Sequence, residues 1–343
     1  MSLHQIAKLA GVSASTVSRV VNDHPTVAAG TAASVREAML KLSLTPAPRR
    51  RVNGRTNGAR ATAIAFLVFG TADSSKAAPA FERLLHGVST EANENDVDLM
   101  FSFVSDRAQL PLRSLGREVG GLLLHGERPT APLQARLSGL PTVWLMANRQ
   151  RPPWGDQVMP DNTVIGEIAA KYLLGRGHRR LAYLGASGGG AWSLALRAFA
   201  FAQVARDGGA DVSVFAADDV RPADGLHAVG ESLVDQLISP AAAPRPTGLF
   251  VAEDRLCPAI DRALRARGLR VGAQADVEIV SCNNERPHLI GLHPRPATID
   301  IRPDAIGRRG VEQLLWRMRN PGVPERVRHL VEPALIEPDQ NGG

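Results

Sequence analysis

The sequence predicts a small all-α headpiece followed by an α/β core of two doubly wound, parallel-sheet lobes. Three observations lead to this prediction. Residues 2–42 carry apolar residues at helical spacing, residues 46–60 have almost nothing to bury, and the remainder alternates apolar runs with helical stretches. At 343 residues, with 44% hydrophobic content, the chain is long enough to form more than one packed domain.

Three short helices are predicted in residues 2–42. Ser2 and Gln5 have the spacing of a capping box that opens the first helix, and Gly11 interrupts the apolar stripe that follows. Ser13 is a good N-cap for the second helix. A third helix is predicted over Thr31–Leu42, because Val35, Ala38, Met39 and Leu42 then share one face.

The stretch LAGVSASTVSRVVNDH (9–24) has the form of two short helices joined by a tight turn. A plain helical hairpin would explain its small residues equally well. It would not explain why Ser13, Ser15, Thr16, Ser18 and Arg19 crowd the exposed side. Hydroxyls and a guanidinium there can bond phosphates and base edges, so this stretch predicts a helix-turn-helix that enters the major groove of DNA.

The basic charge of the chain is concentrated at its N-terminal end. Residues 1–60 hold nine Lys and Arg against two acidic residues, which is +7, whereas the whole chain carries +6 and the remainder therefore −1. Such asymmetry predicts a polyanion as the partner of the first segment alone.

The core is predicted from continuous apolar runs, which are typical of buried parallel strands. The predicted strands are 62–69, 97–103, 120–126, 142–146, 180–185, 247–252 and 277–282, and the predicted helices include Phe81–Glu94, Thr163–Leu174 and Ala191–Arg206. Because these are more strands than one sheet comfortably needs, we expect two lobes.

Composition and motifs also limit the function. The chain has no apolar run of 18 residues and no secretory signal pattern, so we expect a cytoplasmic protein without a membrane partner. Cys257 and Cys282 lack CxxC or His spacing and are expected to be buried thiols, with a redox pair as the alternative. No GxSxG or HExxH motif occurs, so neither an enzyme nor a bound metal or cofactor is predicted.

The segment IAKLAGVSASTVSRVVN, followed by SVREAMLKL, resembles the headpiece of the LacI/GalR family of bacterial transcription regulators. Residues 160–185, 193–201 and 294–315 match its two-lobed core more loosely, and that core resembles the periplasmic sugar-binding proteins. The resemblance implies a headpiece over 1–45, a hinge over 46–60 and a core over 61–343. Lobe one would be 61–160 plus 287–318, and lobe two 161–286 plus 319–338.

The resemblance also implies DNA contacts, with Ala14 and Ser15 at the two positions that choose bases. The implied set is Ser2, Leu3, Ser13, Ala14, Ser15, Thr16, Ser18, Arg19, Asn22, Thr26 and Thr31, with Arg49, Arg50, Arg51 and Asn53 in the hinge. Asn53 stands where the family wedges a leucine into the minor groove, and Arg50 replaces a small residue. We hypothesise that this hinge binds through the charge of Arg49–Arg51 and kinks DNA less.

The implied effector site lies between the lobes, at the carboxyl ends of strands. Arg197 is the leading candidate, since a guanidinium can bond hydroxyls or a carboxylate. The candidate set is Asp73, Ser75, Phe81, Asp161, Trp192, Arg197, Asp254 and Asn283. Asn283 replaces a sugar-holding aspartate of the family, so the effector is expected to be less sugar-like or itself acidic.

The sequence therefore predicts a homodimeric, effector-controlled DNA-binding regulator, a repressor of transcription that associates with the nucleoid. The expected effector is a sugar or sugar derivative, with a nucleobase or an acidic compound as the alternative. Dimerisation is expected to use apolar surface of the helix over Phe81–Val88. Two other classes remain open: a periplasmic binding protein, and a dinucleotide-dependent enzyme that uses the glycines at 185, 188 and 190.

Overall fold

The structure is a computed structural model of the chain, which forms two compact units, Met1–Ala59 and Arg60–Gly343. The described residues are 9–13, 16, 20, 30–31, 33–35, 38, 63–70, 79–104, 119–147, 152, 154–185, 192–217, 225–239 and 244–338. Each unit is treated by itself below.

In the first unit, the described residues bear out the predicted start of the second helix. Gly11 adopts a positive φ of 66°, which suits a tight turn. The backbone N–H of Thr16 donates to Ser13 Oγ at 3.1 Å, which is the hydrogen bond of an N-cap. Val20, Val35 and Ala38 are buried, so the described members of the apolar faces predicted for the second and third helices point inward.

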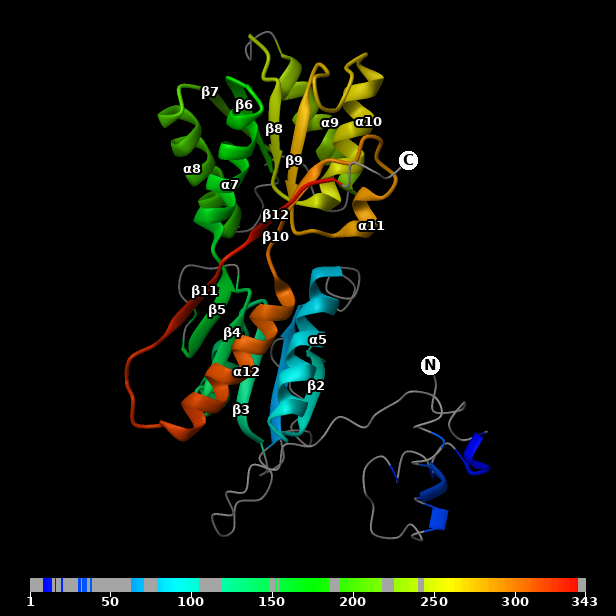
Figure 1. Ribbon diagram of the computed structural model, residues 1–343. Coiled ribbons are helices and arrows are strands. Elements are labelled where there is room, and N and C mark those ends of the chain that lie inside the picture. The colour runs from blue at the N-terminus through cyan, green and yellow to red at the C-terminus, as the bar shows by residue number, and fades with distance from the viewer. Residues whose placement is uncertain are drawn as a thin grey trace. The chain divides into compact units, whose positions relative to one another are not determined.

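Lobe one is built on a six-stranded sheet of order β11-β5-β4-β3-β1-β2, in which every pairing is parallel (Figure 1). Its elements are β1 (Ala63–Phe69), α5 (Pro79–Glu94), β2 (Leu99–Val104), β3 (Val119–Gly126), α6 (Ala131–Leu137), β4 (Thr142–Leu145), β5 (Asp156–Pro160), α12 (Pro303–Arg319) and β11 (Arg328–Val331).

Lobe two repeats this plan with the order β12-β10-β9-β8-β6-β7, and only β12 is antiparallel to its neighbour. Its elements are α7 (Asn162–Gly175), β6 (Arg180–Gly185), α8 (Trp192–Asp207), β7 (Asp211–Ala216), α9 (Gly225–Ile238), β8 (Gly248–Val251), the 3-10 helix η3 (Asp254–Leu256), α10 (Cys257–Ala266), β9 (Glu278–Cys282), α11 (Arg286–Leu289), β10 (Ala297–Asp300) and β12 (Ala334–Ile336).

All seven predicted strands are present, and the predicted fold class is confirmed. The sequence missed the strands that are short or not continuously apolar. β5 reads DQVMP and β10 reads ATID, while β7 lies at a sheet edge and is only half-buried. Whether such a segment forms a strand depends on the neighbouring strand with which it pairs, so the apolar pattern of the segment alone does not predict it.

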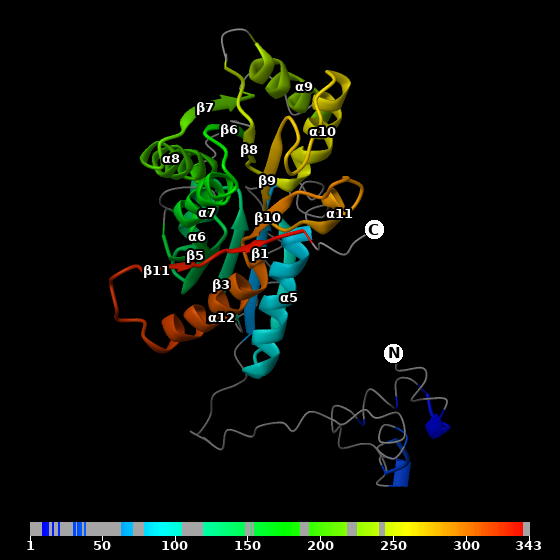
Figure 2. The same ribbon diagram turned by 45° about the horizontal axis from the view of Figure 1, so that its top comes forward.

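The predicted assignment of the C-terminal third to the lobes was wrong in two places. β10 was expected in lobe one, but it pairs with β9 in the sheet of lobe two. The whole of 319–338 was expected in lobe two, but β11 pairs with β5 in lobe one and only β12 joins lobe two. Figure 2 shows the β11–β12 segment passing from one lobe to the other. The backbone partners of each strand, which lie far away in sequence, decide these memberships.

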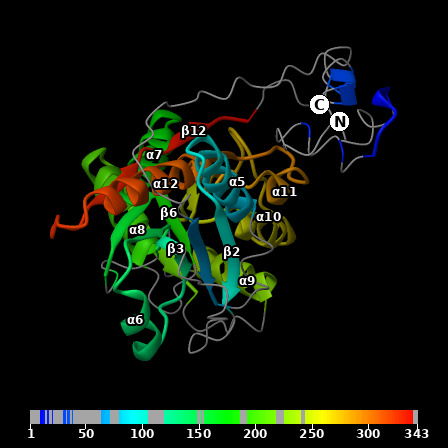
Figure 3. The same ribbon diagram turned by 90° about the horizontal axis from the view of Figure 1, so that it is seen from below.

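Helices in each lobe approach closely where a glycine removes the side chain. α5 and α12 lie side by side in Figures 1 and 3, and a Cβ on Gly87 would lie 2.1 Å from the carbonyl oxygen of Asp304. A Cβ on Gly307 would lie 2.4 Å from the carbonyl oxygen of Leu84. Because such contacts exclude any larger residue, α5 and α12 form one rigid pair.

The helix expected to supply a dimer surface does not offer one over Phe81–Val88. Phe81, Leu84 and Val88 are 8%, 0% and 0% exposed and pack into the core of lobe one. Apolar residues at this helical spacing form the face that packs against the sheet. The prediction that this face is available for dimerisation was therefore wrong. Exposed large apolar side chains in this lobe lie instead on the edge strands β2 and β11 and on α12, at Phe101, Leu330 and Trp316.

The two cysteines of the chain lie in the described part of the structure. Cys257 and Cys282 are both free and fully buried, as predicted. No group of three or more metal-binding side chains occurs in the described ranges. Within those ranges, no helix combines the length and apolar character needed to span a bilayer.

Candidate functional site

Arg197, on the second turn of α8, is the centre of the candidate site and is 5% exposed. Its Nε donates to Asn162 Oδ1 at 3.0 Å, and its Nη1 donates to the carbonyl oxygen of Ala252 at 2.7 Å and to Asn283 Oδ1 at 3.4 Å. Ala252 follows β8 and Asn283 follows β9, so the guanidinium lies at the carboxyl edge of the lobe-two sheet. Ligands of doubly wound sheets bind at this edge.

All three hydrogen-bond partners of Arg197 are neutral. Among the described residues, no carboxylate lies within ion-pair distance of it, and the carboxylate of Glu253 pairs instead with Arg255 at 2.9 Å. A buried charge without a counter-charge is costly unless it is hydrogen-bonded or meets a charged partner. The site is therefore suited to a ligand that brings hydroxyl or carboxylate oxygens.

The backbone around Arg197 is held by close helix packing. A Cβ on Gly166 of α7 would lie 2.4 Å from the carbonyl oxygen of Arg197, so only glycine allows α7 and α8 to approach this closely. The Tyr183 hydroxyl donates to the carbonyl oxygen of Leu194 at 3.1 Å. Burial raises the pKa of Tyr183, which keeps this donor protonated.

Asp254, predicted to contact the effector, instead holds the segment that follows β9. Its side chain is fully buried, with Oδ1 accepting from the Thr298 hydroxyl at 2.8 Å and Oδ2 accepting from the backbone N–H of Glu285 at 2.6 Å. Burial raises the pKa of Asp254 to about 6, although hydrogen bonds from Ser281, Glu285 and Thr298 oppose this shift. Both carboxylate oxygens are therefore already occupied.

The Asn283–Asn284 turn places an amide against Arg197. Asn283 and Asn284 have φ of 113° and 54°, a region that asparagine tolerates better than most residues. The backbone N–H of Asn283 donates to the carbonyl oxygen of Ile299 at 2.9 Å, while that of Asn284 donates to Thr298 Oγ1 at 3.2 Å. These bonds fix the turn and so the position of Asn283 Oδ1.

The other described candidates have structural partners. Asp161 caps α7, because its Oδ1 accepts from the backbone N–H groups of Thr163 and Val164. Trp192 lies under the guanidinium of Arg328, 5.7 Å from its ring centroid. Phe81 belongs to a cluster of aromatic rings in lobe one, with His125 5.5 Å away between centroids.

One residue of the site was missed at the sequence level. Asn162 is 3% exposed and accepts the Nε–H of Arg197, yet only its neighbour Asp161 was predicted. The PDNT motif contains both Asp161 and Asn162, but helical spacing does not show which of two adjacent polar residues faces inward.

Other predicted residues lie outside the described part of the chain. These are the effector candidates Asp73 and Ser75, the glycines at 188 and 190, and the DNA candidates Ser2, Leu3, Ala14, Ser15, Ser18, Arg19, Asn22, Thr26, Arg49, Arg50, Arg51 and Asn53. Of the DNA candidates that are described, Ser13 and Thr16 share the capping contact, and Thr31 lies in a helix.

His178 is part of a partly buried polar contact. Its Nε2 lies 2.9 Å from Glu278 Oε2 and its Nδ1 lies 3.0 Å from Thr247 Oγ1. Burial raises the pKa of Glu278, but His178 and the charge of Arg176 outweigh it and the pKa is lowered. A cavity of about 190 Å³ lies beside Glu278, at the amino ends of β9 and β10, and two of its lining charges, Arg176 and Glu278, pair with each other.

Two similar parallel-sheet lobes, with a polar site at the carboxyl edge of one sheet, define the class of two-lobed ligand-binding proteins. Residues 170–338 match the family model of the periplasmic binding protein-like domain. Residues 2–47 match that of the bacterial regulatory proteins of the lacI family. The chain is also 30% identical to the HTH-type transcriptional regulator GntR of Pseudomonas aeruginosa over 322 residues, 92% of this chain and 88% of that protein.

The chain therefore belongs to the LacI family of bacterial regulatory proteins, as its sequence predicts. It is 28% identical over 192 residues to the HTH-type transcriptional regulator MalR of Streptococcus pneumoniae. That match covers 54% of this chain and spans about half of MalR, 57% of its length. A solved transcriptional regulator CelR–cellobiose complex shares the fold, with a TM-score of 0.63, 23% identity and 98% of each chain covered.

Proposed function

We propose that this regulator binds operator DNA through its N-terminal unit and represses transcription under the control of a small molecule bound at Arg197. The observation that carries the effector site is the buried guanidinium, whose three partners Asn162, Ala252 and Asn283 are all neutral. The relatives are named as transcriptional regulators and not as enzymes.

The proposed effector is a sugar or sugar derivative. Arg197 can donate to ligand oxygens, while the amides of Asn162 and Asn283 can both donate and accept, which suits adjacent hydroxyl groups. The cellobiose bound by CelR supports this class. An acidic compound is the second candidate, because no carboxylate of the described residues neutralises Arg197.

The proposed DNA contacts are the headpiece and hinge residues named in the sequence analysis, with Ala14 and Ser15 as the base-choosing pair. The capping bond from Thr16 to Ser13 supports a helix that begins at this point. A homodimer would present two such helices to a pseudo-palindromic site. The half-exposed edge strand β2, with Phe101 outward, is the proposed contact between the copies.

The effector proposal is tested by a binding screen on the purified full chain. Sugars, sugar acids and nucleobases are screened by thermal shift, and hits are measured by calorimetry. Arg197→Ala removes a charged donor, whose hydrogen bonds contribute about 1.5–3 kcal/mol, so affinity should fall on the order of 10- to 100-fold. Arg206→Ala changes an exposed arginine of the same helix and should leave affinity unchanged.

A hit that binds Arg197→Ala as tightly as the unchanged chain would remove Arg197 from the site. DNA binding is measured separately, by selecting duplexes from a random pool with the full chain. A selected pseudo-palindrome that is released by the hit supports both halves of the proposal, and failure to select any duplex contradicts the first half.

A further inference from the structure

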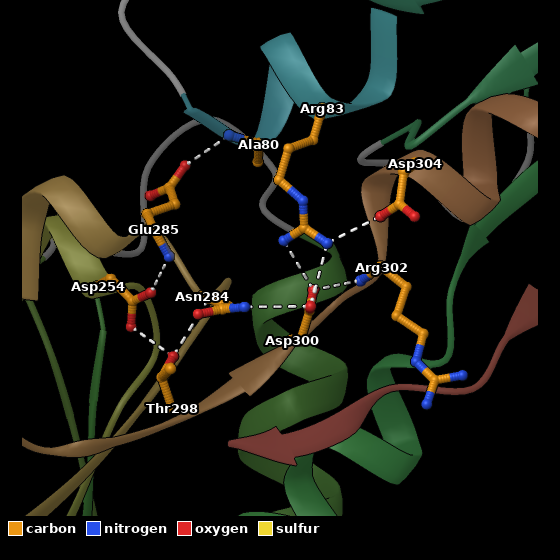
Figure 4. Close-up of polar contacts among 9 residues, drawn as sticks. All are labelled: Ala80, Arg83, Asp254, Asn284, Glu285, Thr298, Asp300, Arg302 and Asp304. Carbon is orange, nitrogen blue, oxygen red and sulfur yellow. Dashed lines mark hydrogen bonds and ion pairs between the residues drawn. The ribbon is translucent and has the colours of Figure 1, made fainter. Parts of the chain in front are cut away.

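Arg83, on α5 of lobe one, reaches across to lobe two (Figure 4). Its Nη1 and Nη2 donate to the two oxygens of Asp300, each at 3.0 Å, and Nη2 also donates to Asp304 Oδ1 at 2.8 Å. Asp300 is the last residue of β10 in lobe two, whereas Asp304 lies in the first turn of α12 in lobe one. The guanidinium therefore joins a lobe-two carboxylate to a lobe-one carboxylate in fork geometry.

Asp300 is also bonded to the turn that positions the site. Its Oδ2 accepts from Asn284 Nδ2 at 3.1 Å, and its Oδ1 accepts from the backbone N–H of Arg302 at 2.7 Å. Asn284 directly follows Asn283, the amide that accepts a hydrogen bond from Arg197. One carboxylate therefore connects helix α5 to the residue next to the proposed effector contact.

A second contact joins the same turn to the start of α5. Glu285 Oε1 accepts from the backbone N–H of Ala80 at 3.3 Å. The backbone N–H of Glu285 is in turn held by Asp254, which also holds Thr298. The turn is thus connected to α5 at two points about one helical turn apart, as Figure 4 shows. Glu285 bonds Ala80 directly, and Asn284 is linked to Arg83 through Asp300.

Within lobe one, α5 packs tightly against α12. Gly87 and Gly307 lock α5 to α12, and α12 begins directly after the crossover from β10. The contact is also partly shielded from water, since the side chains of Arg83 and Asp300 are 34% and 14% exposed. Such a pair is screened less by salt than a fully exposed one.

We propose that Arg83, Asn284 and Asp300 form an interlobe latch, in which they are positioning residues for the effector site. The latch holds α5 of lobe one against the lobe-two turn that carries Asn283. Effector affinity and lobe closure are then coupled, because a ligand held between the lobes favours the latched arrangement. The coupling rests on the proposed function, whereas the latch itself does not.

The latch is tested by measuring the distance between the lobes in the full chain without ligand. Ala135→Cys on α6 and Gln203→Cys on α8 place one exposed label in each lobe, and the native cysteines are fully buried. Both cysteines are spin-labelled, and the labelled chain is diluted into unlabelled chain so that only distances within one chain are measured. Double electron–electron resonance then gives the distribution of distances between the two labels. Arg83→Met should broaden the distribution toward other distances, and Arg83→Lys should have an intermediate effect because the fork is lost.

Arg308→Met is the matched control. Arg308 lies on α12 and pairs with Glu91 and Glu94 of α5, so it joins the same two helices within lobe one only. The distribution should stay as in the unchanged chain. An unaltered distribution in Arg83→Met, or an equal change in Arg308→Met, would overturn the latch.

A second arm tests the coupling with a hit from the effector screen. Arg83→Met should weaken its binding by about fivefold, at the lower end of couplings between sites, and Arg308→Met should not. Asn284→Ala should weaken binding in the unchanged chain but add little in the Arg83→Met background. Unchanged affinity in Arg83→Met would overturn the coupling. If no hit exists, the proposed function fails, while the distances still decide the latch.

Discussion

The two lobes share one strand order but treat a buried charge in opposite ways. In lobe one, Asp156 is 1% exposed and accepts from Arg317 Nη2 at 2.7 Å, Arg317 Nε at 3.0 Å and Gln313 Nε2 at 2.7 Å. In lobe two, Arg197 is 5% exposed and bonds only neutral groups. The first charge is neutralised within the fold, whereas the second has no carboxylate partner among the described residues.

The difference follows from position in the sheet. Asp156 opens β5, at the amino edge of lobe one, whereas the partners of Arg197 follow β8 and β9 at the carboxyl edge of lobe two. The carboxyl edge is where the loops of a doubly wound sheet form a binding crevice. The ion at the amino edge is paired within its own lobe, whereas the one at the carboxyl edge is the proposed effector contact.

The largest effect is expected from removing the buried carboxylate of lobe one. Asp156→Ala leaves Arg317, whose side chain is 12% exposed, without its carboxylate, and should lower the free energy of unfolding by about 3–5 kcal/mol. Urea unfolding followed by circular dichroism measures this. The control Glu312→Ala removes an exposed pair with Arg309 on the same helix and should cost less than about 1 kcal/mol. Equal losses in both variants would show that Asp156 has no special structural role.

A smaller effect is expected when the lobe-two backbone is disturbed. Gly166→Ala places a Cβ 2.4 Å from the carbonyl oxygen of Arg197 and 2.7 Å from the backbone nitrogen of Phe201, so α8 must shift. The free energy of unfolding should fall by about 1–3 kcal/mol, and effector binding should weaken with it. Gly175→Ala, in the same helix with nothing within 4 Å, is the control and should do neither. Retained affinity in Gly166→Ala would separate α7–α8 packing from the site.

The last prediction concerns the pH dependence of the lobe-two carboxylate. Burial raises the pKa of Asp254 to about 6, above its value in the unfolded chain, so the folded state keeps this proton at higher pH. Between pH 4 and 6, this group should therefore make stability fall as pH rises, by at most about 1.4 kcal/mol per pH unit. Asp254→Asn removes that contribution.

Urea unfolding of the unchanged chain and Asp254→Asn from pH 4 to 7 gives the difference between their stabilities. That difference should change between pH 4 and 6 and level off above. A difference that stays constant across this range would mean that Asp254 does not titrate there.

Much of the fold could be predicted from sequence because it depends on local patterns. Continuous apolar runs marked seven strands, and the Ser13 cap marked a helix start, since a side-chain hydroxyl bonds a backbone group three residues away. Arg197 was predicted through family resemblance, and the structure buries it as the centre of a polar set. Each of these features can be recognised from a short, continuous stretch of the sequence.

What the sequence determined by itself was therefore the family and the order of most elements, with Arg197 as the leading candidate for the site. Only the tertiary structure decided that β10 belongs to lobe two and β11 to lobe one, that Phe81 is core, and that Asp254 accepts from the Glu285 backbone and from Thr298. Only it brought Arg83 onto Asp300, 217 residues away. The physical reason is that a polar side chain bonds whichever partner the packing brings near, and periodicity along the chain does not encode that partner.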